Sequence, residues 1–567
     1  MTLSRYPFSM PTLSLSEDVL QALGAFAQVV EDDFKALTAA LGPVNQWISW
    51  RSVSAALFVA FGLRVLSIRR RLGAIGNVPG LRLVVAPEFP YPLPRIPYIC
   101  MDAEWWNKLR HEPFADAGTD VLSVASLTSG TVSYVAADPV ALKISHQLIK
   151  PQEMYKLLNL VGVHIVTAEG ADYRRHRMPA QGSFTERNNR LVWDTSLELA
   201  QRITQSDTWI GKDVVEIDEA VKLTLPYAMR VINVAGFGRS VSDSKVQTLP
   251  AGSVMTFEEA IEVAMANLVT LAIVPRWAIR WVASWRRVDD SLNEALNTSR
   301  ALIAERRADL SDADDRIDLL SSLVRAADSE ADPNLRLTDA ELVSDVIAFL
   351  VAGHETTAHS VAIALGLLAL HPEEQDKVYE ELKTYSEPGM APKYEDLNKL
   401  RRIHAVLQET LRLYPPIPRI SKASAVDTHI PLAFPAPNGM TSVPVPKGTI
   451  FTAHIVGLHY NPRWWKDPFL FRPERFLDPE WPRDAFLPFS AGPRVCIGRR
   501  FAETESIAFM ATILAKYHVE LPHHTKQKLE GITDERVRRE RGLKVEQRLT
   551  LMPVELGLVF RKRKGDE

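Results

Sequence analysis

From about residue 150 onward, apolar residues recur at the 3.6-residue spacing of amphipathic helices. The strongest patterns predict five helices, over 188–205, 288–309, 338–370, 372–386 and 395–413. Two other stretches, 443–452 and 547–561, are short and rich in strand-forming residues, which favours β-strands. The chain contains no internal repeat and no long low-complexity segment. These patterns predict a mainly α fold with a minor β-sheet, in a single large domain over 101–567.

The N-terminal part of the chain follows a different pattern. Residues 1–50 form a leader with one amphipathic helical stretch, and no apolar signal region begins near Met1. An apolar run over 52–68 follows, contains Arg64, and ends at three consecutive arginines. A membrane-spanning helix needs about 20 apolar residues, but a long cationic side chain near a helix end can reach the polar interface. We therefore predict a transmembrane anchor over 51–71 with its arginine end in the cytosol; a buried amphipathic helix is the alternative.

A proline-rich segment over 72–100 separates this anchor from the predicted domain. It holds six prolines between residues 79 and 97. Proline at that density excludes a long helix and favours a stiff, extended connector.

Composition narrows the classes of protein that the chain can represent. Apolar residues make up 46% and charged residues 24%, as in ordinary globular proteins. The net charge of -3 and the absence of a basic array with interleaved aromatics speak against a nucleic-acid partner. The two cysteines, Cys100 and Cys496, cannot form a disulfide framework. This favours a reducing compartment for the domain.

Cys496 lies in a glycine-punctuated loop just before a helical pattern over 499–517. A buried structural thiol, a nucleophile paired with a histidine, and a thiolate metal ligand all fit such a position. A helix N-terminus favours the thiolate and lowers its pKa. No CxxC pair or Cys/His cluster accompanies the residue, which argues against zinc. Among metal sites, a single axial thiolate to haem iron remains.

The stretch FSAGPRVCIG resembles the cysteine-ligand loop of the cytochrome P-450 family. The family pattern is Phe, two residues, Gly, one residue, Arg, one residue, Cys, one residue, Gly. Every defined position is matched, by Phe489, Gly492, Arg494, Cys496 and Gly498. The resemblance implies the P-450 fold over roughly residues 75–560, with Cys496 as the proximal iron ligand. It also implies that Phe489 packs beside the sulfur and that Arg494 pairs with a haem propionate.

Two further motifs match the supports of that loop in the family. ETLR places Glu409 and Arg412 on one helix face, where a surface ion pair is the ordinary interpretation. FRPERF supplies Arg475. In the family, such a glutamate and two arginines form a buried network below the haem loop. The resemblance therefore implies that these three residues are structural supports, not catalysts.

The motif AGHETT lies in the most apolar of the predicted helices, where a simple kink is the alternative interpretation. Ala352 and Gly353 have little or no side chain, so a flat cofactor can approach the backbone closely. Thr356 can donate to the carbonyl of residue 352, or release it and bind a ligand. The resemblance implies that Glu355 and Thr356 are the acid–alcohol pair that relays protons to iron-bound dioxygen. We expect His354 to pack or to meet solvent rather than to ligate.

Upstream, the segment EGADYRRHRMPAQGSF resembles the part of the family that reaches the haem propionates. Members often carry Trp or His four residues before an arginine; these positions are Tyr173 and Arg177 in this chain. His176 is the next candidate, and a solvated charge cluster is the alternative. Arg419, after the helix that carries ETLR, occupies a place where the family often has another propionate partner.

The resemblance implies a monooxygenase that uses haem b and inserts one atom of O2 into a lipophilic small molecule, which we expect to belong to secondary metabolism. No flavin, nicotinamide or iron–sulfur motif is evident, so electrons must come from a partner. NADPH–cytochrome P-450 reductase is the expected partner, with cytochrome b5 as a second candidate. The architecture indicates a eukaryotic, fungal-type enzyme of the endoplasmic reticulum membrane, with one spanning segment and a cytosolic catalytic domain.

Two alternatives remain at this point. A non-oxygenating relative would isomerise or dehydrate an oxygenated substrate, but such enzymes tend to lack the acid–alcohol pair. A haem-binding sensor or electron carrier would more naturally use two protein ligands to iron, and no second ligand loop is evident.

A second membrane contact is predicted in the segment 268–287. Trp277, Trp281 and Trp285 recur every four residues there, with arginines between them. Tryptophan favours the membrane interface. A buried helix face with a basic rim is the alternative.

Overall fold

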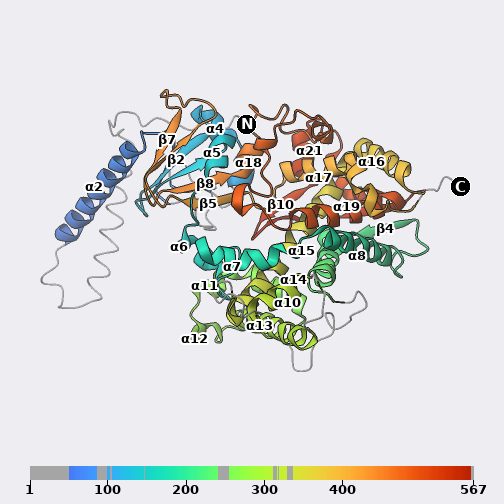
Figure 1. The fold of residues 1–567 in the computed structure, drawn as a ribbon. Coiled ribbons are helices and arrows are strands. Elements are labelled where there is room, and N and C mark those ends of the chain that lie inside the picture. Colours follow the sequence, from blue (N-terminus) through green and yellow to red (C-terminus); the bar gives the residue numbers. More distant parts are fainter. Residues whose placement is uncertain are drawn as a thin grey trace. The chain divides into compact units, whose positions relative to one another are not determined.

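The computed structural model describes residues 50–85, 99–101, 105–145, 147–239, 255–310, 316, 318–328, 336–387 and 389–563. Residues 1–49 of the predicted leader and residues 86–98 of the predicted proline-rich connector therefore lie outside the described residues. The fold is mainly helical with small sheets, as the sequence predicts (Figure 1).

Contacts divide the chain into two compact units. The first unit comprises residues 1–148 and 421–457, and the second comprises 149–420 and 458–567. This division does not follow the boundary at residue 101 that the sequence suggested. The reason is that one sheet contains strands from both stretches of the first unit, 1–148 and 421–457.

The first unit is built around a five-stranded sheet with the order β1-β2-β3-β8-β5. The strands are β1 (Gly80–Leu83), β2 (Val121–Ser126), β3 (Val132–Ala136), β8 (Ile450–His454) and β5 (Arg419–Ala423). Strands β1 and β2 are parallel, β2 and β3 are antiparallel, and β3 and β8 are parallel. A hairpin of β6 (Thr428–Pro431) and β7 (Ser442–Val445) and the helices α3 (Trp105–Leu109), α4 (Glu112–Ala117) and α5 (Pro139–Ser145) complete the unit.

Helix α2 (Trp50–Ala74) covers the predicted anchor as one continuous helix of 25 residues (Figure 1). Leu72, near its C-terminal end, is buried, whereas the apolar side chains from Leu57 to Leu66 are largely exposed. Arg64 donates to the carbonyls of Thr128 and Ser129, at 3.3 and 3.4 Å, in the turn between β2 and β3. Among the described helices, α15 is long and apolar enough to cross a membrane, and most of its apolar window is buried; α2 does not meet the same criterion of length and hydropathy.

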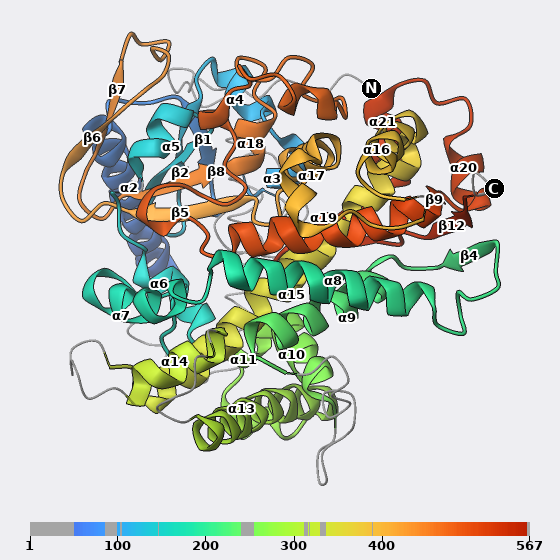
Figure 2. The ribbon, with the colours of Figure 1, turned by 45° about the vertical axis from the view of Figure 1, so that its right-hand side comes forward.

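The second unit is organised around α15 (Asp339–Leu370). Thr338 and Glu341 form a capping box that begins this helix, which contacts α9 (Val221–Val231), α17 (Arg401–Leu413) and α19 (Arg499–Lys516). Helix α8 (Glu186–Thr204) lies along α19 (Figure 2). The remaining larger helices are α7 (Gly170–Gln181), α10 (Phe257–Ala266), α13 (Ala283–Asp309), α14 (Leu319–Asp328), α16 (Pro372–Tyr385), α20 (His523–Leu529) and α21 (Glu535–Gly542).

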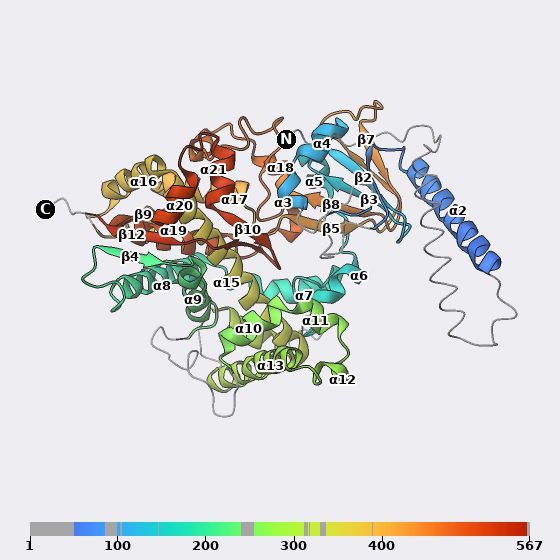
Figure 3. The same cartoon turned by 180° about the vertical axis from the view of Figure 1, so that it is seen from behind.

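Two small sheets complete the second unit. An antiparallel sheet has the order β4-β12-β9, from β4 (Val214–Ile217), β12 (Leu558–Lys562) and β9 (Tyr517–Glu520) (Figure 3). A separate hairpin pairs β10 (Lys544–Gln547) with β11 (Leu551–Val554).

Three of the predicted elements are divided in the structure, and one of them is the stretch 547–561, which contains β11 and β12 of two different sheets. The stretch 395–413 forms a 3-10 helix, Tyr394–Lys399, followed by α17, because Leu400 leaves the helical conformation. The Glu381 carboxylate accepts hydrogen bonds from the backbone N–H groups of residues 402 and 403 and so caps α17. The stretch 443–452 contains a turn at Gly448, whose φ is +81°, and contributes to two different sheets.

Candidate active site around Cys496

The cysteine loop is a closed turn in front of α19. The N–H of Cys496 donates to the carbonyl of Phe489 at 2.9 Å, which closes the loop. Ser490 and Gly492 have positive φ values of 62° and 68°, so this turn requires left-handed backbone. Gly498 is the N-cap residue of α19. The sulfur is therefore held two residues ahead of the positive end of a helix dipole.

Cys496 is exposed to solvent as a residue, although protein atoms fill most of the space around its sulfur. Burial raises its pKa, whereas the N–H of Gly498 and the positive charges of Arg177 and Arg499 lower it. The net shift of the pKa is upward in the protein without a bound metal. The loss of hydration outweighs the donors; a cation at the sulfur would reverse the balance. Cys100 is buried in the first unit.

Arg494 is held by Glu169 and Ala168, directly before α7, and by Tyr173 within α7. Its Nη2 lies 2.8 Å from Oε1 of Glu169 and also donates to the carbonyl of Ala168 at 2.6 Å. Its guanidinium lies 3.3 Å from the ring centroid of Tyr173, within the range of a cation–π contact. The cation predicted to meet a propionate is thus already neutralised by Glu169, a residue that the sequence analysis did not select.

Helix α7 brings the other predicted propionate partners to the same loop. Arg177 Nη1 donates to Tyr173 Oη at 2.8 Å and to the carbonyl of Val495 at 3.3 Å. The Tyr173 hydroxyl donates in turn to the carbonyl of Pro493 at 3.1 Å. Positions 173 and 177 share one face of α7 because they are four residues apart. The segment singled out from the sequence therefore lies against the cysteine loop.

His176 lies on another face of α7, away from these partners. It is fully buried, and its Nδ1 lies 2.6 Å from Oδ2 of Asp345 on α15. Beside it, Arg175 pairs with Glu341 at 2.7 Å. The structure therefore does not place His176 with Tyr173 and Arg177. His176 instead helps to dock α7 onto α15.

The middle of α15 presents one accessible face on an otherwise buried helix. The accessible residues between 342 and 368 are Ala348, Ala352, Gly353, Glu355 and Thr356. Their spacing places them on one side of the helix. Thr356 Oγ1 donates to the carbonyl of Ala352 at 2.8 Å, the back-bond that its position allows.

The remaining residues of this motif have distinct environments. His354 is buried and packs as expected, and its Nδ1 donates to the carbonyl of Leu350 at 2.6 Å; burial lowers its pKa to about 4. Burial raises the pKa of Glu355, and the Thr550 hydroxyl and the charge of Arg548 lower it. The sequence provided no signal for Thr550, because it belongs to the distant β10–β11 hairpin.

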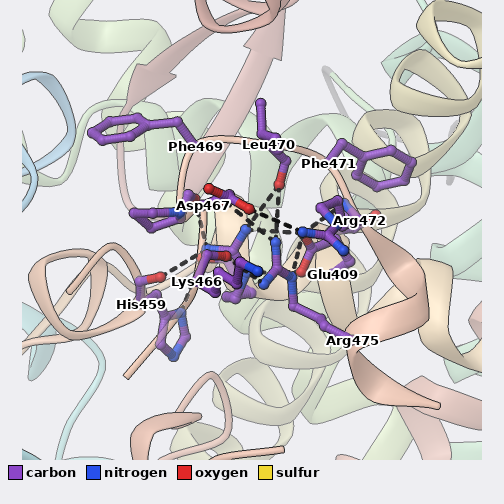
Figure 4. A network of polar contacts seen from close by, with 12 residues as sticks. Glu409, His459, Lys466, Asp467, Phe469, Leu470, Phe471, Arg472 and Arg475 are labelled. Atoms are coloured by element: carbon purple, nitrogen blue, oxygen red, sulfur yellow. Dashed lines mark hydrogen bonds and ion pairs between the residues drawn. The ribbon is translucent and has the colours of Figure 1, made fainter. Parts of the chain in front are cut away.

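Glu409, Arg412 and Arg475 form one buried network (Figure 4). Glu409 and Arg412 are fully buried, with 2.7 Å between Arg412 Nε and Glu409 Oε2 and 2.9 Å between Nη2 and Oε1. Arg475 Nε lies 3.1 Å from Glu409 Oε1, which also accepts from the N–H of Arg472. The other guanidinium N–H groups donate to carbonyls of the chain between 459 and 470, at His459, Lys466, Pro468 and Leu470. The charges are thus compensated, as a buried network requires.

Two further predicted residues, Phe489 and Arg419, are half-buried in the structure. The Phe489 ring is half-buried, with the Arg499 guanidinium 5.4 Å from its centroid. Arg419 is half-buried at the start of β5. Their roles toward a haem stay predictions.

The residues present fit a haem with one protein ligand. Cys496 supplies a sulfur with an N–H donor from Gly498. Arg177 and Arg494 supply cationic groups beside the loop, which suit two propionates. The accessible face of α15 carries small residues next to an acid and an alcohol, which would suit the approach of a flat macrocycle.

Comparisons with known proteins give relatives over most of the chain. Residues 154–546 match the family model described as Cytochrome P450. The chain is 38% identical over 503 residues to Cytochrome P450 monooxygenase 124 of Postia placenta, covering 88% of this chain and 96% of that protein. It is 26% identical over 472 residues to Cytochrome P450 monooxygenase ORF6 of Penicillium roqueforti, covering 75% and 79%. The crystal structure of the cytochrome P450DA heme domain aligns with a TM-score of 0.66 at 24% identity, covering 86% of this chain and 99% of that one, and has the same fold.

Proposed function

The chain belongs to the cytochrome P450 family and is a haem-thiolate monooxygenase, and from this premise we propose that it oxidises a lipophilic small molecule of secondary metabolism. The chain is similar over most of its length to the fungal monooxygenases named above, which supports this proposal. The reaction class is hydroxylation, epoxidation or a related insertion of one oxygen atom. The observation that carries it is the cysteine loop with its N–H donor and its two neighbouring arginines.

In this proposal the cysteine loop and α7 hold the cofactor. When bound, haem supplies the iron that activates dioxygen, and an anionic sulfur ligand favours O–O cleavage. Cys496 would provide that sulfur, with Phe489 shielding it and Gly492 and Gly498 shaping the turn. The propionates would be bound by cations and hydroxyl donors, namely Arg494, Arg177, Tyr173 and Arg419. Ala352 and Gly353 would let the macrocycle approach α15.

Glu355 and Thr356 would take up and release protons at the accessible face of α15. Thr356 already bonds to the carbonyl of Ala352, so it can exchange that partner for a ligand without unfolding the helix. Glu355 is half-buried, and burial raises its pKa, which suits a group that both takes up and gives up a proton. Glu409, Arg412 and Arg475 would act only by supporting the chain below the loop.

Carbon monoxide binding tests the thiolate assignment. The reduced, haem-loaded protein should give the Soret shift typical of a thiolate ligand, Cys496→Ser should abolish it, and the matched Cys100→Ser should keep it. A folded, haem-loaded protein without this shift would overturn the proposal. Incubation of candidate lipophilic substrates with heavy-isotope-labelled dioxygen then separates oxygen insertion from isomerisation or dehydration, since only insertion labels the product.

The electron source is proposed to be NADPH through a flavoprotein reductase, with cytochrome b5 as a second donor. Reconstitution with NADPH–cytochrome P-450 reductase should give turnover, and a ferredoxin system in its place should give much less. Equal or better turnover with ferredoxin would contradict this partner.

Membrane attachment is proposed to use α2. Its exposed apolar side chains, Leu57, Phe58, Val59, Phe61, Leu63 and Leu66, form a surface that water disfavours. Arg64 lies on the turn at Gly130, so the edge of the bilayer would fall on the N-terminal side of Arg64. Replacement of Leu57, Phe58 and Phe61 by serine should release the protein from endoplasmic reticulum membranes. Ile210→Ser, an exposed apolar position elsewhere, is the matched control.

A second lipid contact is proposed at α12 (Arg276–Ile279) and the turn after it. Trp277 and Trp281 are 68% and 79% exposed, and their ring centroids are 5.6 Å apart. Trp285 is half-buried, so the proposed contact has two tryptophans and not the three in the predicted pattern. Trp277→Ala with Trp281→Ala should weaken binding of the full chain to phosphatidylcholine–phosphatidylserine vesicles. Phe434→Ala is the control. Unchanged vesicle binding of the double tryptophan variant would exclude this contact.

A further inference from the structure

The turn between β10 and β11 places a threonine against the buried part of α15. Thr550 Oγ1 lies 2.9 Å from Nδ1 of His359, and both residues are buried. The turn itself is fixed on two sides. The N–H of Arg548 donates to the carbonyl of Thr550 at 3.0 Å, and the N–H of Leu551 donates to the carbonyl of Pro416 at 2.9 Å. The position of the Thr550 hydroxyl is therefore determined by backbone contacts rather than by a free loop.

The same hydroxyl also interacts with Glu355. This hydroxyl lowers the pKa of the Glu355 carboxyl, which burial raises. Positions 355 and 359 are one turn apart on α15, so a single hydroxyl can reach both side chains. His359, Thr550 and Glu355 thus form one line of polar groups that ends beside Thr356.

The direction of the hydrogen bonds follows from the donors and acceptors available. An ionised carboxylate can only accept, so the Thr550 proton points to Glu355. The threonine oxygen must then accept from His359, whose Nδ1 carries the proton. His359 is neutral at physiological pH because burial, His354 and Arg548 lower its pKa to about 3. A neutral imidazole with one N–H matches this requirement.

We propose that Thr550, oriented by His359, is a positioning residue that holds the Glu355 carboxylate as an acceptor toward the active face of α15. The proposal deepens the monooxygenase function and rests on the role of Glu355 proposed above. The charged and titratable groups that face Glu355 are Arg548 on the hairpin turn and Glu262 on α10, and those that face His359 are His354 and Arg548.

Loss of the Thr550 hydroxyl should change how the electrons from NADPH divide between product and hydrogen peroxide. Oxygen insertion consumes the substrate RH, O2, two electrons and two protons and yields ROH and water. If protons are delivered at the wrong place, the same O2, electrons and protons leave as hydrogen peroxide, and RH is untouched. Without the Thr550 hydroxyl, the Glu355 carboxylate loses an interaction that favours its ionised form, so its pKa rises further. We expect product per NADPH to fall and peroxide to rise.

The test compares Thr550→Val, which removes the hydroxyl at nearly constant shape, with Thr550→Ser, which keeps it. Thr550→Val should lower product per NADPH several-fold and move the acidic limb of the pH profile to higher pH, and Thr550→Ser should restore both. His359→Leu should act in the same direction. Thr512→Val is the matched control, because Thr512 is a buried threonine that bonds only within α19. If Val and Ser at position 550 behave alike, the proposal is wrong.

A measurement without turnover completes the test. The infrared carboxyl band that disappears in Glu355→Gln should titrate at higher pH in Thr550→Val than in the native protein. An unchanged titration would overturn the proposal even if activity fell. Failure of the proposed function is separate, because it would show as a missing thiolate-type carbon monoxide spectrum in the native protein.

Discussion

The Arg494 guanidinium of the cysteine loop is paired with the Glu169 carboxylate, with 2.8 Å between Nη2 and Oε1. Glu169 is the residue directly before α7. The ion pair therefore joins the iron-ligand loop to the helix that carries Tyr173 and Arg177. It also gives Arg494 a counter-charge that does not depend on the haem.

This pair predicts that Glu169→Gln destabilises the haem-free protein more than the haem-loaded one. In the haem-free protein, Arg494, only 12% exposed, loses its counter-charge at a cost of about 1–2 kcal/mol. In the loaded protein a propionate can replace it. Thermal unfolding of both forms measures the difference, with Glu153→Gln, in an exposed ion pair with Lys156, as the control. Equal losses in both forms would mean that Arg494 does not exchange partners.

Removal of the charge of Glu409 should be among the most destabilising single changes in the second unit. Glu409→Gln leaves the buried Arg412 and the largely buried Arg475 without their carboxylate, which typically costs about 3–5 kcal/mol. Chemical denaturation of the haem-loaded protein measures the change in free energy of unfolding. Glu198→Gln removes an exposed partner of Arg202 and should cost less than about 0.5 kcal/mol. Similar losses in the two variants would contradict the buried network.

Loss of the Thr356 hydroxyl should impair the reaction but not haem binding. Thr356→Ala removes the group proposed to pass protons, and such groups contribute on the order of 10²-fold. Product formation should fall while NADPH consumption continues and peroxide accumulates. Thr356→Ser should retain most of the activity. Thr384→Ala, which removes the same type of back-bond on α16, is the control for helix stability. Full product yield in Thr356→Ala would show that another group delivers the proton.

Acid should destabilise the protein through its buried histidines. Burial lowers the pKa of His354 to about 4 and that of His459 to about 3, from an ordinary value of 6.5. Between pH 6.5 and 4 the unfolded chain binds these protons and the folded chain does not. The free energy of unfolding therefore falls as the pH falls through this window, by about 1–2 kcal/mol per histidine at pH 5.

His354→Gln tests this dependence directly. The variant should show a shallower fall of the free energy of unfolding between pH 6.5 and 5, because one proton fewer is taken up on unfolding. His429→Gln, which removes an exposed imidazole on β6, is the matched control. A slope identical to that of the native protein would mean that His354 is protonated in the folded state.

The sequence alone determined the features that depend on local spacing. The helices α8, α13, α15 and α16 follow from apolar periodicity, because each buries one or more faces over several turns. Cys496, Gly492 and Gly498 are recognisable for a related reason, since a tight turn before a helix needs those residue types at fixed separations. Glu409 and Arg412 also share a face by local geometry alone.

Only the tertiary structure decided which distant groups meet. Glu169 finds Arg494, His176 turns to Asp345 rather than to the cysteine loop, and Thr550 reaches α15 from the C-terminal hairpin. Sequence spacing cannot predict these pairs, because they depend on how helices and hairpins pack. The thiol pKa of Cys496 has the same origin. The helix dipole that lowers it is a local feature, whereas the burial that outweighs this effect is a property of the folded chain.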